Sequence, residues 1–242
     1  MLFSATILIN RISRSVCVTA VWLTIVTLAA LTSVFAYPRL HRRLLRYQSH
    51  RAADAATAQL APQLRDGDLI FHTSQSAQSR AIQLATHSVW SHCGIVYKAG
   101  ANWQVFEAVQ PVKLTPLADW MARGQGGHFV TKRLRDAATA LTPAALARLK
   151  AAGQPMLGHS YDLYFGWSDD RIYCSELIWK VYERGLDRRL GQLQHLRDFD
   201  LSHPAVRAKL RERYGNRLPL DETVISPVSI FRSPELVTVL SR

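Results

Sequence analysis

The chain has 242 residues, enough for one domain of ordinary size with a sizeable core and an additional terminal segment. Hydrophobic residues make up 48% and charged residues 20%, a composition that excludes an intrinsically disordered chain. The net charge is +12, but residues 1–51 hold seven arginines and no acidic residue. Because this excess flanks an apolar segment and no nucleic-acid-binding motif accompanies it, we expect a membrane rather than nucleic acid as partner.

The N-terminal segment contains a run of 22 uncharged residues from Val16 to Tyr37. About 20 apolar residues span a bilayer as a helix, so residues 1–37 are predicted to be a signal-anchor or transmembrane segment. Small residues around Val34-Phe35-Ala36 also suit a signal peptidase, and cleavage of an export signal is the alternative. Arginines on both sides of the run leave its orientation open. A basic, alanine-rich linker is predicted over 38–61 and a folded domain over 62–242.

Within the folded domain, turn residues and alternating apolar residues predict strands, and caps with apolar stripes predict helices. Strands are predicted over 68–71, 91–97, 103–109 and 128–134. Helices are predicted over 76–86, 142–152, 175–183 and 204–214, and the helix after Cys174 is expected to end before Gly185. Residues 113–122 are predicted to hold a Thr-Pro start and a short helix. The remaining C-terminal stretch, with its three prolines, is predicted to be irregular. Strands that precede helices without strict alternation indicate an α+β fold with an antiparallel sheet.

Cys174 is the first candidate for chemistry, because an apolar stripe begins directly after it in the segment Tyr173-Cys174-Ser175-Glu176. This pattern places the cysteine in the first turn of a helix, where free backbone N–H groups and the helix dipole lower a thiol's pKa. A thiolate is the reactive form, so the position suits a nucleophile. A small buried cysteine at a helix start is the structural alternative.

His92 and Glu107 are candidates for the base and the acid that orients it. A four-residue hairpin loop over Lys98–Ala101 would pair Tyr97 with Asn102 and would place His92 directly opposite Glu107 on one face of the sheet. Opposed side chains of that kind have Cβ atoms about 4.5–5.5 Å apart, close enough for a carboxylate to bond one imidazole nitrogen. The other nitrogen would then be held toward a nucleophile. A slip of one residue in the register would remove this contact.

Three cysteines are present, and Cys17 lies inside the apolar run. If the body of the protein is exported, Cys93 and Cys174 could instead form one disulfide. No C-x-x-C pair, H-E-x-x-H motif, Walker loop or G-x-S-x-G motif occurs, and the nine histidines show no metal-ligand spacing. We therefore expect neither a metal nor a cofactor.

The combined motifs resemble the permuted NlpC-type papain-like cysteine hydrolases, in particular the YiiX-like group of bacterial exported proteins. The resemblance covers roughly residues 65–235. It is carried by Gly67-Asp68-Leu69-Ile70-Phe71, the segment 78–88, Ser91-His92-x-Gly94, Phe106-Glu107-Ala108-Val109, Tyr161-Asp162, the segment 167–171 and Tyr173-Cys174-Ser175-Glu176. The resemblance implies a papain-like α+β fold in which a small antiparallel sheet packs against the nucleophile helix and the histidine strand precedes the cysteine helix.

For the site, the resemblance implies Cys174 as nucleophile, His92 as base and Glu107 as third polar residue, with a body on the periplasmic side of the inner membrane or exported. We expect the backbone N–H of Cys174 to stabilise an oxyanion. Tyr173, Gln78 and Ser91 are candidates for a second donor or for substrate contact.

Three classes of function follow from this constellation. The first is a hydrolase of an amide bond, peptide or lipid-linked, that acts through a Cys174 thioester. The second is an acyltransferase that uses the same thioester with a lipid or amine acceptor. The third is a non-catalytic binding module on the same fold. The expected partners are an amide- or ester-containing substrate, such as a lipid or cell-envelope component, and the membrane through residues 16–37.

Overall fold

The protein is described by a computed structural model that covers residues 40, 41, 55 and 57–242. The predicted membrane segment and most of the predicted linker lie outside the described residues. No helix among the described residues is long and apolar enough to cross a bilayer. By its contacts the chain divides into residues 1–51 and residues 52–242. The second unit contains the sheet and both hydrophobic clusters described below.

The elements follow one another along the chain with short connections. The strands are β1 (Asp68–Ser74), β2 (His92–Ala99), β3 (Asn102–Glu107), β4 (Lys113–Pro116), β5 (Gly124–Leu134), β6 (Ser160–Tyr161), β7 (Arg171–Ile172), β8 (Gln194–His195), β9 (Thr223–Val224) and β10 (Leu236–Ser241). The α-helices are α2 (Ala77–Thr86), α3 (Leu117–Ala122), α4 (Ala137–Ala140), α5 (Pro143–Gly153), α6 (Cys174–Leu186), α7 (Pro204–Tyr214) and α8 (Pro227–Phe231). Short 3-10 turns cover Ala61–Gln63, Gln154–Met156 and Leu196–Asp198.

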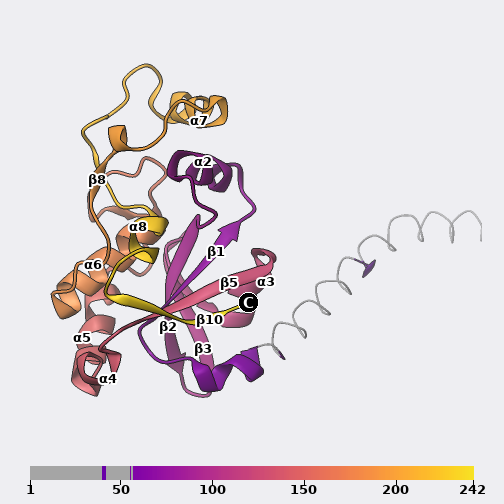
Figure 1. Cartoon of the computed structure of the whole chain (residues 1–242), viewed down its shortest axis with the longest axis vertical. Coiled ribbons are helices and arrows are strands. Elements are labelled where there is room, and N and C mark those ends of the chain that lie inside the picture. Colours follow the sequence, from indigo (N-terminus) through magenta and orange to yellow (C-terminus); the bar gives the residue numbers. More distant parts are fainter. Residues whose placement is uncertain (1–39, 42–54, 56) are drawn as a thin grey trace, which may run out of the picture. The chain divides into compact units, whose positions relative to one another are not determined.

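Six strands form one sheet in the order β10-β5-β1-β2-β3-β4, and each neighbouring pair is antiparallel (Figure 1). Helices α5 and α6 lie on one side of this sheet, and α3 lies on the other. Two-stranded pairs β6-β7 and β8-β9 stand apart from the sheet. The predicted α+β class with an antiparallel sheet packed against the cysteine helix is confirmed.

Both faces of the sheet are buried, because successive residues of its strands are apolar and their side chains point to opposite faces. Phe71, Ile95 and Phe106 belong to the cluster that packs under α6. Their neighbours Ile70 and Val96 belong to a second cluster on the opposite face. Successive side chains of a strand point to opposite faces, so strands with apolar residues at every position require cover on both sides. The second cluster includes Leu60 and Leu64, so the packed domain begins slightly before the expected residue 62.

The β2–β3 hairpin has a shorter loop than expected. Ala99 pairs with Asn102, which leaves Gly100 and Ala101 as a two-residue turn in place of the predicted loop over 98–101. Gly100 has φ +61°, and glycine at the first central position is typical of a type II′ hairpin turn. The predicted register was therefore wrong by two residues. A shift of two preserves the face to which each side chain points, and His92 and Glu107 remain on the same side.

Helix α6 continues beyond the predicted end before Gly185. It runs to Leu186 and stops at Asp187, whose left-handed φ of 53° closes the helix. Gly185 is instead a packing residue, since a Cβ there would lie 2.9 Å from Leu149 Cα on α5. The absence of a side chain lets the two helices approach closely, and this contact overrides the helix-ending tendency of glycine.

The C-terminal stretch is also more ordered than expected. Residues 227–231 form α8, with Pro227 at its first position, and β10 pairs with β5 at the edge of the sheet. The prediction of an irregular end was wrong because prolines were taken as breaks, whereas a proline at the first position of a helix begins it. Helix α3 is the short helix predicted within residues 113–122, and β4 covers the residues before it.

Candidate active site

The candidate nucleophile Cys174 is the first residue of α6 and its side chain is buried, with 2% exposed. Tyr173 is the N-cap in an extended conformation. The first N–H groups of a helix lack partners within the helix, so they and the helix dipole are directed at this end. The structure thus confirms the prediction that Cys174 lies in the first turn of a helix.

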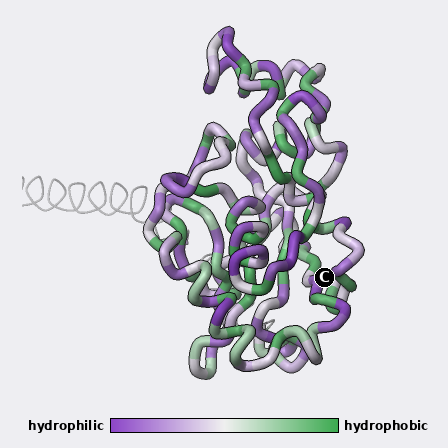
Figure 2. Tube along the Cα trace, turned by 90° about the vertical axis from the view of Figure 1, so that its left-hand side faces the viewer, coloured by the Kyte–Doolittle hydropathy of each residue, from purple (hydrophilic) through white to green (hydrophobic). Residues whose placement is uncertain are grey.

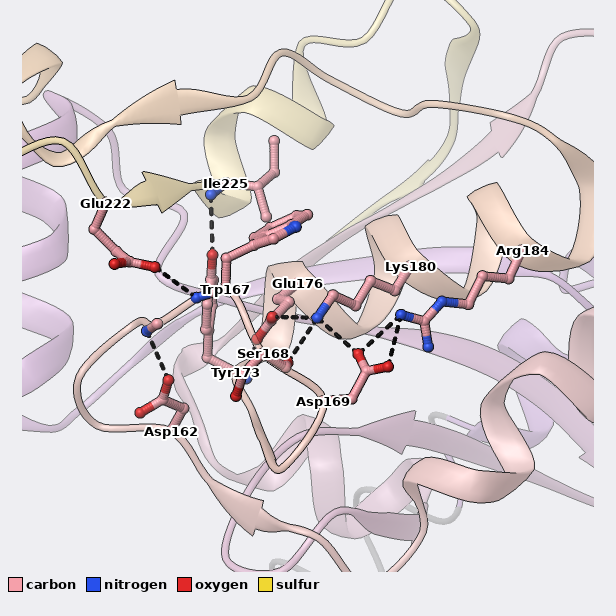
Figure 3. A network of polar contacts seen from close by, with 11 residues as sticks. Asp162, Trp167, Ser168, Asp169, Tyr173, Glu176, Lys180, Arg184, Glu222 and Ile225 are labelled. Atoms are coloured by element: carbon pink, nitrogen blue, oxygen red, sulfur yellow. Dashed lines mark hydrogen bonds and ion pairs between the residues drawn. The ribbon is translucent and has the colours of Figure 1, made fainter.

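The first turn of α6 is held in place by buried polar contacts (Figure 3). The Tyr173 backbone N–H donates to Glu176 Oε2 at 3.3 Å, and the Tyr173 hydroxyl accepts from the Ile225 N–H at 3.0 Å. Glu176 Oε1 pairs with Lys180 Nζ at 2.7 Å, and Lys180 also reaches Asp169 at 2.9 Å. These contacts come from three segments of the chain and fix the direction in which α6 begins.

His92 begins β2 and Glu107 ends β3, and His92 Nε2 lies 2.6 Å from Glu107 Oε2. The contact is diagonal, because continuing the hairpin register places Gly94 opposite Glu107. A Cβ at Gly94 would lie 2.4 Å from Val105 Cγ1 and 2.9 Å from the Phe106 carbonyl oxygen. Glycine at this position therefore keeps the strands close enough for the carboxylate to reach the imidazole.

Glu107 is fully buried and has two further partners that the sequence did not suggest. The Thr115 hydroxyl donates to Oε1 at 2.5 Å, and the Arg123 guanidinium pairs with the same oxygen. Burial alone would raise the pKa of Glu107, but the hydrogen bond and charge of His92, together with Arg123 and Thr115, lower it to about 2. The carboxylate therefore stays ionised beside His92 at all physiological pH values.

The other imidazole nitrogen of His92 forms a hydrogen bond with the side chain of Cys174. Burial disfavours the imidazolium, yet the hydrogen bonds with Cys174 and Glu107 raise the pKa of His92 to about 9. A hydrogen bond from Cys93 and one from His92, acting against burial, lower the pKa of Cys174 well below that of an ordinary thiol. The site therefore favours a thiolate–imidazolium pair, the reactive form of a cysteine nucleophile.

Cys93 and Cys174 are both free in the structure. The structure therefore does not contain the alternative disulfide between these two cysteines. Cys93 is completely buried, and its pKa lies well above the usual value because of burial and the neighbouring Cys174. As a neutral thiol it donates a hydrogen bond to the thiolate. The sequence analysis gave Cys93 no role beyond a disulfide, since its contact with α6 arises only from the packing of β2.

His72 is a further buried residue beside the site. It pairs with His92 across β1 and β2, its ring stacks on Trp120 at 3.9 Å, and it lies 5.2 Å from the ring of His92. Burial, together with the charges of His92 and Arg123, lowers the pKa of His72 to about 2, so the ring is neutral. A neutral ring can lie beside the His92 imidazolium without repulsion.

The three expected substrate-contact residues lie in different surroundings. The side chain of Tyr173 is 1% exposed and its hydroxyl is occupied by the Ile225 N–H. Ser91 is buried, where its hydroxyl contacts Ser79 and accepts from a backbone N–H of β1. Gln78, on α2, borders both cavities described below. Of the three, Gln78 is best placed to reach a bound substrate.

Tyr161, named in the sequence analysis only as part of the family resemblance, is a further polar candidate at the site. Its hydroxyl accepts from Gln78 Nε2 at 3.0 Å. Burial and the nearby Cys174 charge raise the pKa of Tyr161 well above its usual value, so the hydroxyl keeps its proton. That proton is available to a group at Cys174. Only the pairing of β6 with β7, just before α6, brings Tyr161 to this place.

An apolar cavity of about 90 Å³ extends from Cys174 between α2 and α7. Its walls include Ile82, Phe165, Phe199, Leu201, Val206 and Leu210. The basic side chains Lys209 and Arg213 also border it, and Arg213 donates to Gln78 Oε1 at 2.8 Å.

A second cavity of about 340 Å³ lies on the His92 side and is lined by both polar and apolar side chains. Its walls include Ser74, Ser76, Ser79, Ser91, Gln110 and Tyr161. Cys174 and His92 therefore lie between an apolar cavity and one of mixed lining, with Gln78 and Ile82 common to both.

A buried cysteine at a helix start, a histidine on an antiparallel strand and a carboxylate on the next strand define a cysteine hydrolase-type site on a papain-like fold. A sequence model of the permuted papain-like amidase enzymes, the YaeF/YiiX or C92 family, matches residues 63–240. The chain therefore belongs to this family, as its motifs had indicated.

Two similar proteins come from Escherichia coli. The uncharacterized protein YiiX of strain K12 is 49% identical over 177 residues, which cover 73% of this chain and 86% of that protein. A crystal structure described as that of the metalloprotein YiiX from E. coli O157:H7 is 48% identical, with a TM-score of 0.71. It covers 74% of this chain and 98% of that one.

Because that relative is described as a metalloprotein, the side chains of this chain were compared with known kinds of metal site. Among the described residues, no three His, Cys, Asp or Glu side chains gather in a way that would hold a metal ion. The nearest potential donors, His92 and Cys174, are hydrogen-bonded to each other, and Glu107 is engaged by Arg123. Protein sites for zinc offer three or four such donors. The described side chains do not fit a resident metal, and no chemical step below involves one.

Proposed function

We propose that the chain is an amidase that cleaves the amide bond between an aliphatic acyl group and a polar amine, through a thioester on Cys174. The observation that supports this most is the position of the Cys174–His92–Glu107 contact between an apolar cavity and a second cavity that also carries serines and Gln110. Membership of the amidase family supports the reaction class. The two cavities support the choice of an acyl amide over a peptide.

The proposed reaction begins from the thiolate–imidazolium pair. The Cys174 thiolate attacks the amide carbonyl, forming the C–S bond, and the carbonyl oxygen becomes an oxyanion. As the C–N bond breaks, the imidazolium of His92 gives its proton to the departing amine. His92, now neutral, then removes a proton from water, which attacks the thioester and releases the carboxylic acid. Glu107 keeps the imidazole ring in place throughout and remains ionised.

The oxyanion requires donors that point at it in the water-excluded site. The backbone N–H of Cys174, at the first position of α6, is one proposed donor. The hydroxyl of Tyr161 is the proposed second donor, because its oxygen already accepts from Gln78 and its proton is free for another acceptor. In this assignment Gln78 acts on the oxyanion through Tyr161.

The direction of the substrate follows from the proton path. His92 protonates the leaving amine, so the amine lies on the His92 side, where the cavity is lined by serines and Gln110. The acyl group then lies on the other side of Cys174, in the apolar cavity between α2 and α7. An acyl chain gains about 0.8 kcal/mol for each CH₂ that it buries, so longer chains should bind more tightly until the cavity is filled.

The test is hydrolysis of N-acyl amines of one polar amine, from acetyl to palmitoyl, with the released acid measured by mass spectrometry. We expect kcat/KM to rise with chain length and to disappear in Cys174→Ser. Leu210→Trp, which fills the apolar cavity, should shift the preference toward shorter chains, whereas Leu114→Trp on β4, an exposed leucine, should not. Adding a free amine or alcohol acceptor distinguishes transfer of the acyl group from hydrolysis. Activity on peptides with no preference for acyl amides would refute the proposed substrate.

A further inference from the structure

Helix α7 has two faces of different chemistry. Val206 and Leu210, one helical turn apart, face inward and line the apolar cavity over α2. Arg207 and Arg211, also four residues apart, are both exposed on the outer side. Residues at that spacing lie on one face of a helix. The helix therefore covers the apolar cavity with one face and presents arginines to the outside with another.

Positive charge is concentrated in this part of the molecule. Residues 203–220 contain five basic residues and one acidic residue, a net charge of +4. Residues 57–242 as a whole contain 23 basic and 17 acidic residues. Two acids follow the stretch directly, of which Asp221 pairs with Arg197 and Glu222 accepts from the Trp167 N–H. The one acid, Glu212, is paired with Lys209 at 2.6 Å. Among the described residues, Arg207, Arg211 and Arg217 form no ion pair, and their charges face the surroundings.

Exposed apolar side chains lie next to these arginines. Leu218 and Leu220 follow α7 directly and are 38% and 41% exposed. Tyr164, 44% exposed, is joined to the end of α7 by a hydrogen bond from the Tyr214 hydroxyl to its carbonyl oxygen. At the top of the molecule in Figure 2, the end that carries α7, hydrophilic and hydrophobic residues are intermixed. We refer to Arg207, Arg211, Arg217, Leu218 and Leu220 as the α7 surface.

We propose that the α7 surface docks the folded domain onto an anionic phospholipid bilayer. Arginines beside leucines match the boundary of a membrane, where cationic groups meet lipid phosphates and apolar side chains enter the acyl region. Each basic residue near such a surface strengthens the binding. Nucleic-acid binding is dominated by contacts with phosphodiester groups, and exposed leucine side chains do not make such contacts. Docking depends only on this surface and needs no catalysis by Cys174.

The test is co-sedimentation of residues 52–242 with vesicles of phosphatidylcholine alone, or of phosphatidylcholine and phosphatidylglycerol in equal parts. This unit holds both hydrophobic clusters, and its cooperative unfolding is checked first by circular dichroism. We expect binding to the anionic vesicles and little to the neutral ones, with affinity falling as salt is raised. The triple variant Arg207→Gln, Arg211→Gln, Arg217→Gln should bind at least about tenfold more weakly.

Two further variants separate a specific surface from net charge. Arg189→Gln, Arg232→Gln and Arg242→Gln remove three exposed arginines elsewhere and should leave the affinity unchanged. Leu218→Ser with Leu220→Ser should remove the binding that persists at high salt. Equal losses in the two arginine triples would overturn the proposal, as would unchanged binding in the α7 triple. Tighter binding to a short duplex DNA than to the anionic vesicles, at the same salt concentration, would assign the surface to nucleic acid and also overturn it.

Discussion

Single residues of the site depend on one another for their protonation states. Arg123 and Thr115 keep Glu107 ionised, Glu107 keeps His92 protonated, and His92 with Cys93 keeps Cys174 a thiolate. Each group is buried, and a buried charge is tolerated only with a partner of opposite charge or a hydrogen-bond donor. Removal of one member should therefore change the titration of the next.

The first prediction concerns the reactivity of Cys174 toward iodoacetamide as a function of pH. Because the pKa of Cys174 is lowered, the wild-type domain should be alkylated rapidly even at about pH 6, where an ordinary thiol is almost entirely protonated. In His92→Ala the pH dependence should move upward, since the imidazolium that stabilises the thiolate is gone. Mass spectrometry of the Cys174 peptide measures the rate. Slow alkylation that titrates near pH 8.5 in both proteins would contradict the assignment of Cys174 as nucleophile.

The second prediction concerns stability as a function of pH in Glu107→Gln. The pKa of Glu107 is lowered from 4.5 to about 2 in the folded state. A lowered folded-state pKa contributes stability that is present above pH 4.5 and is lost as the pH falls through about 2. The variant should therefore have a free energy of unfolding about 2–3 kcal/mol lower at neutral pH, with the difference shrinking toward pH 2.

Urea unfolding followed by circular dichroism at several pH values measures this difference. Glu183→Gln, a substitution of the same kind on α6, is the control and should change the free energy of unfolding little at any pH. Because the pKa of His92 is raised to about 9, the share of stability from its charge is present below pH 6.5 and is lost as the pH rises through about 9. A difference that does not depend on pH would mean that Glu107 is not ionised in the folded protein.

At the scale of elements, the site depends on how α6 sits between α5 and the sheet. Gly185 is the point of closest approach between α5 and α6, and the network around Lys180 and Glu176 holds the other end of α6. Both ends of the helix must be correctly placed, because Cys174 is its first residue. Sequence periodicity predicted the helix, but only the packing of α5 explains why a glycine lies within it.

The third prediction is that Gly185→Ala destabilises the protein. Helix propensity alone would make alanine better than glycine by about 1 kcal/mol inside a helix. The added Cβ would instead lie 2.9 Å from Leu149 Cα, a backbone contact that cannot yield without moving a helix. We expect a net loss of about 1–3 kcal/mol in the free energy of unfolding. Ala147→Gly on the exposed side of α5 serves as the matched control and should cost about 1 kcal/mol by propensity alone. Stabilisation by Gly185→Ala would show that the helices are not in close contact.

At the scale of the whole molecule, residues 52–242 form a unit with its own cores. The sheet and both hydrophobic clusters involve only residues from Leu60 onward. A chain of this size can bury enough apolar surface to fold by itself. The sheet closes with β10 against β5, so the last residues of the chain belong to the fold.

The fourth prediction is that residues 52–242 alone unfold cooperatively in urea, with a two-state transition seen by circular dichroism and tryptophan fluorescence alike. Their Cys174 alkylation profile should match that of the full chain. Removal of residues 236–242 should lower the free energy of unfolding, because β5 loses its partner strand. A broad transition, or different midpoints for the two probes, would show that residues 1–51 are needed for folding.

The sequence by itself determined the α+β class, most helix positions and the family, because these follow from periodicity, caps and short motifs within single segments. It also brought together Cys174, His92 and Glu107 as candidates, even though the predicted hairpin register was shifted by two residues. The roles of Cys93, Arg123, His72 and Tyr161 emerged only from the tertiary structure. Each contacts a partner that is distant in the chain, and no local pattern records such a contact. The two cavities were likewise decided only by packing. The walls of the apolar one combine α2 with α7, and those of the other combine α2 with residues of β1, β2 and the segment after β3.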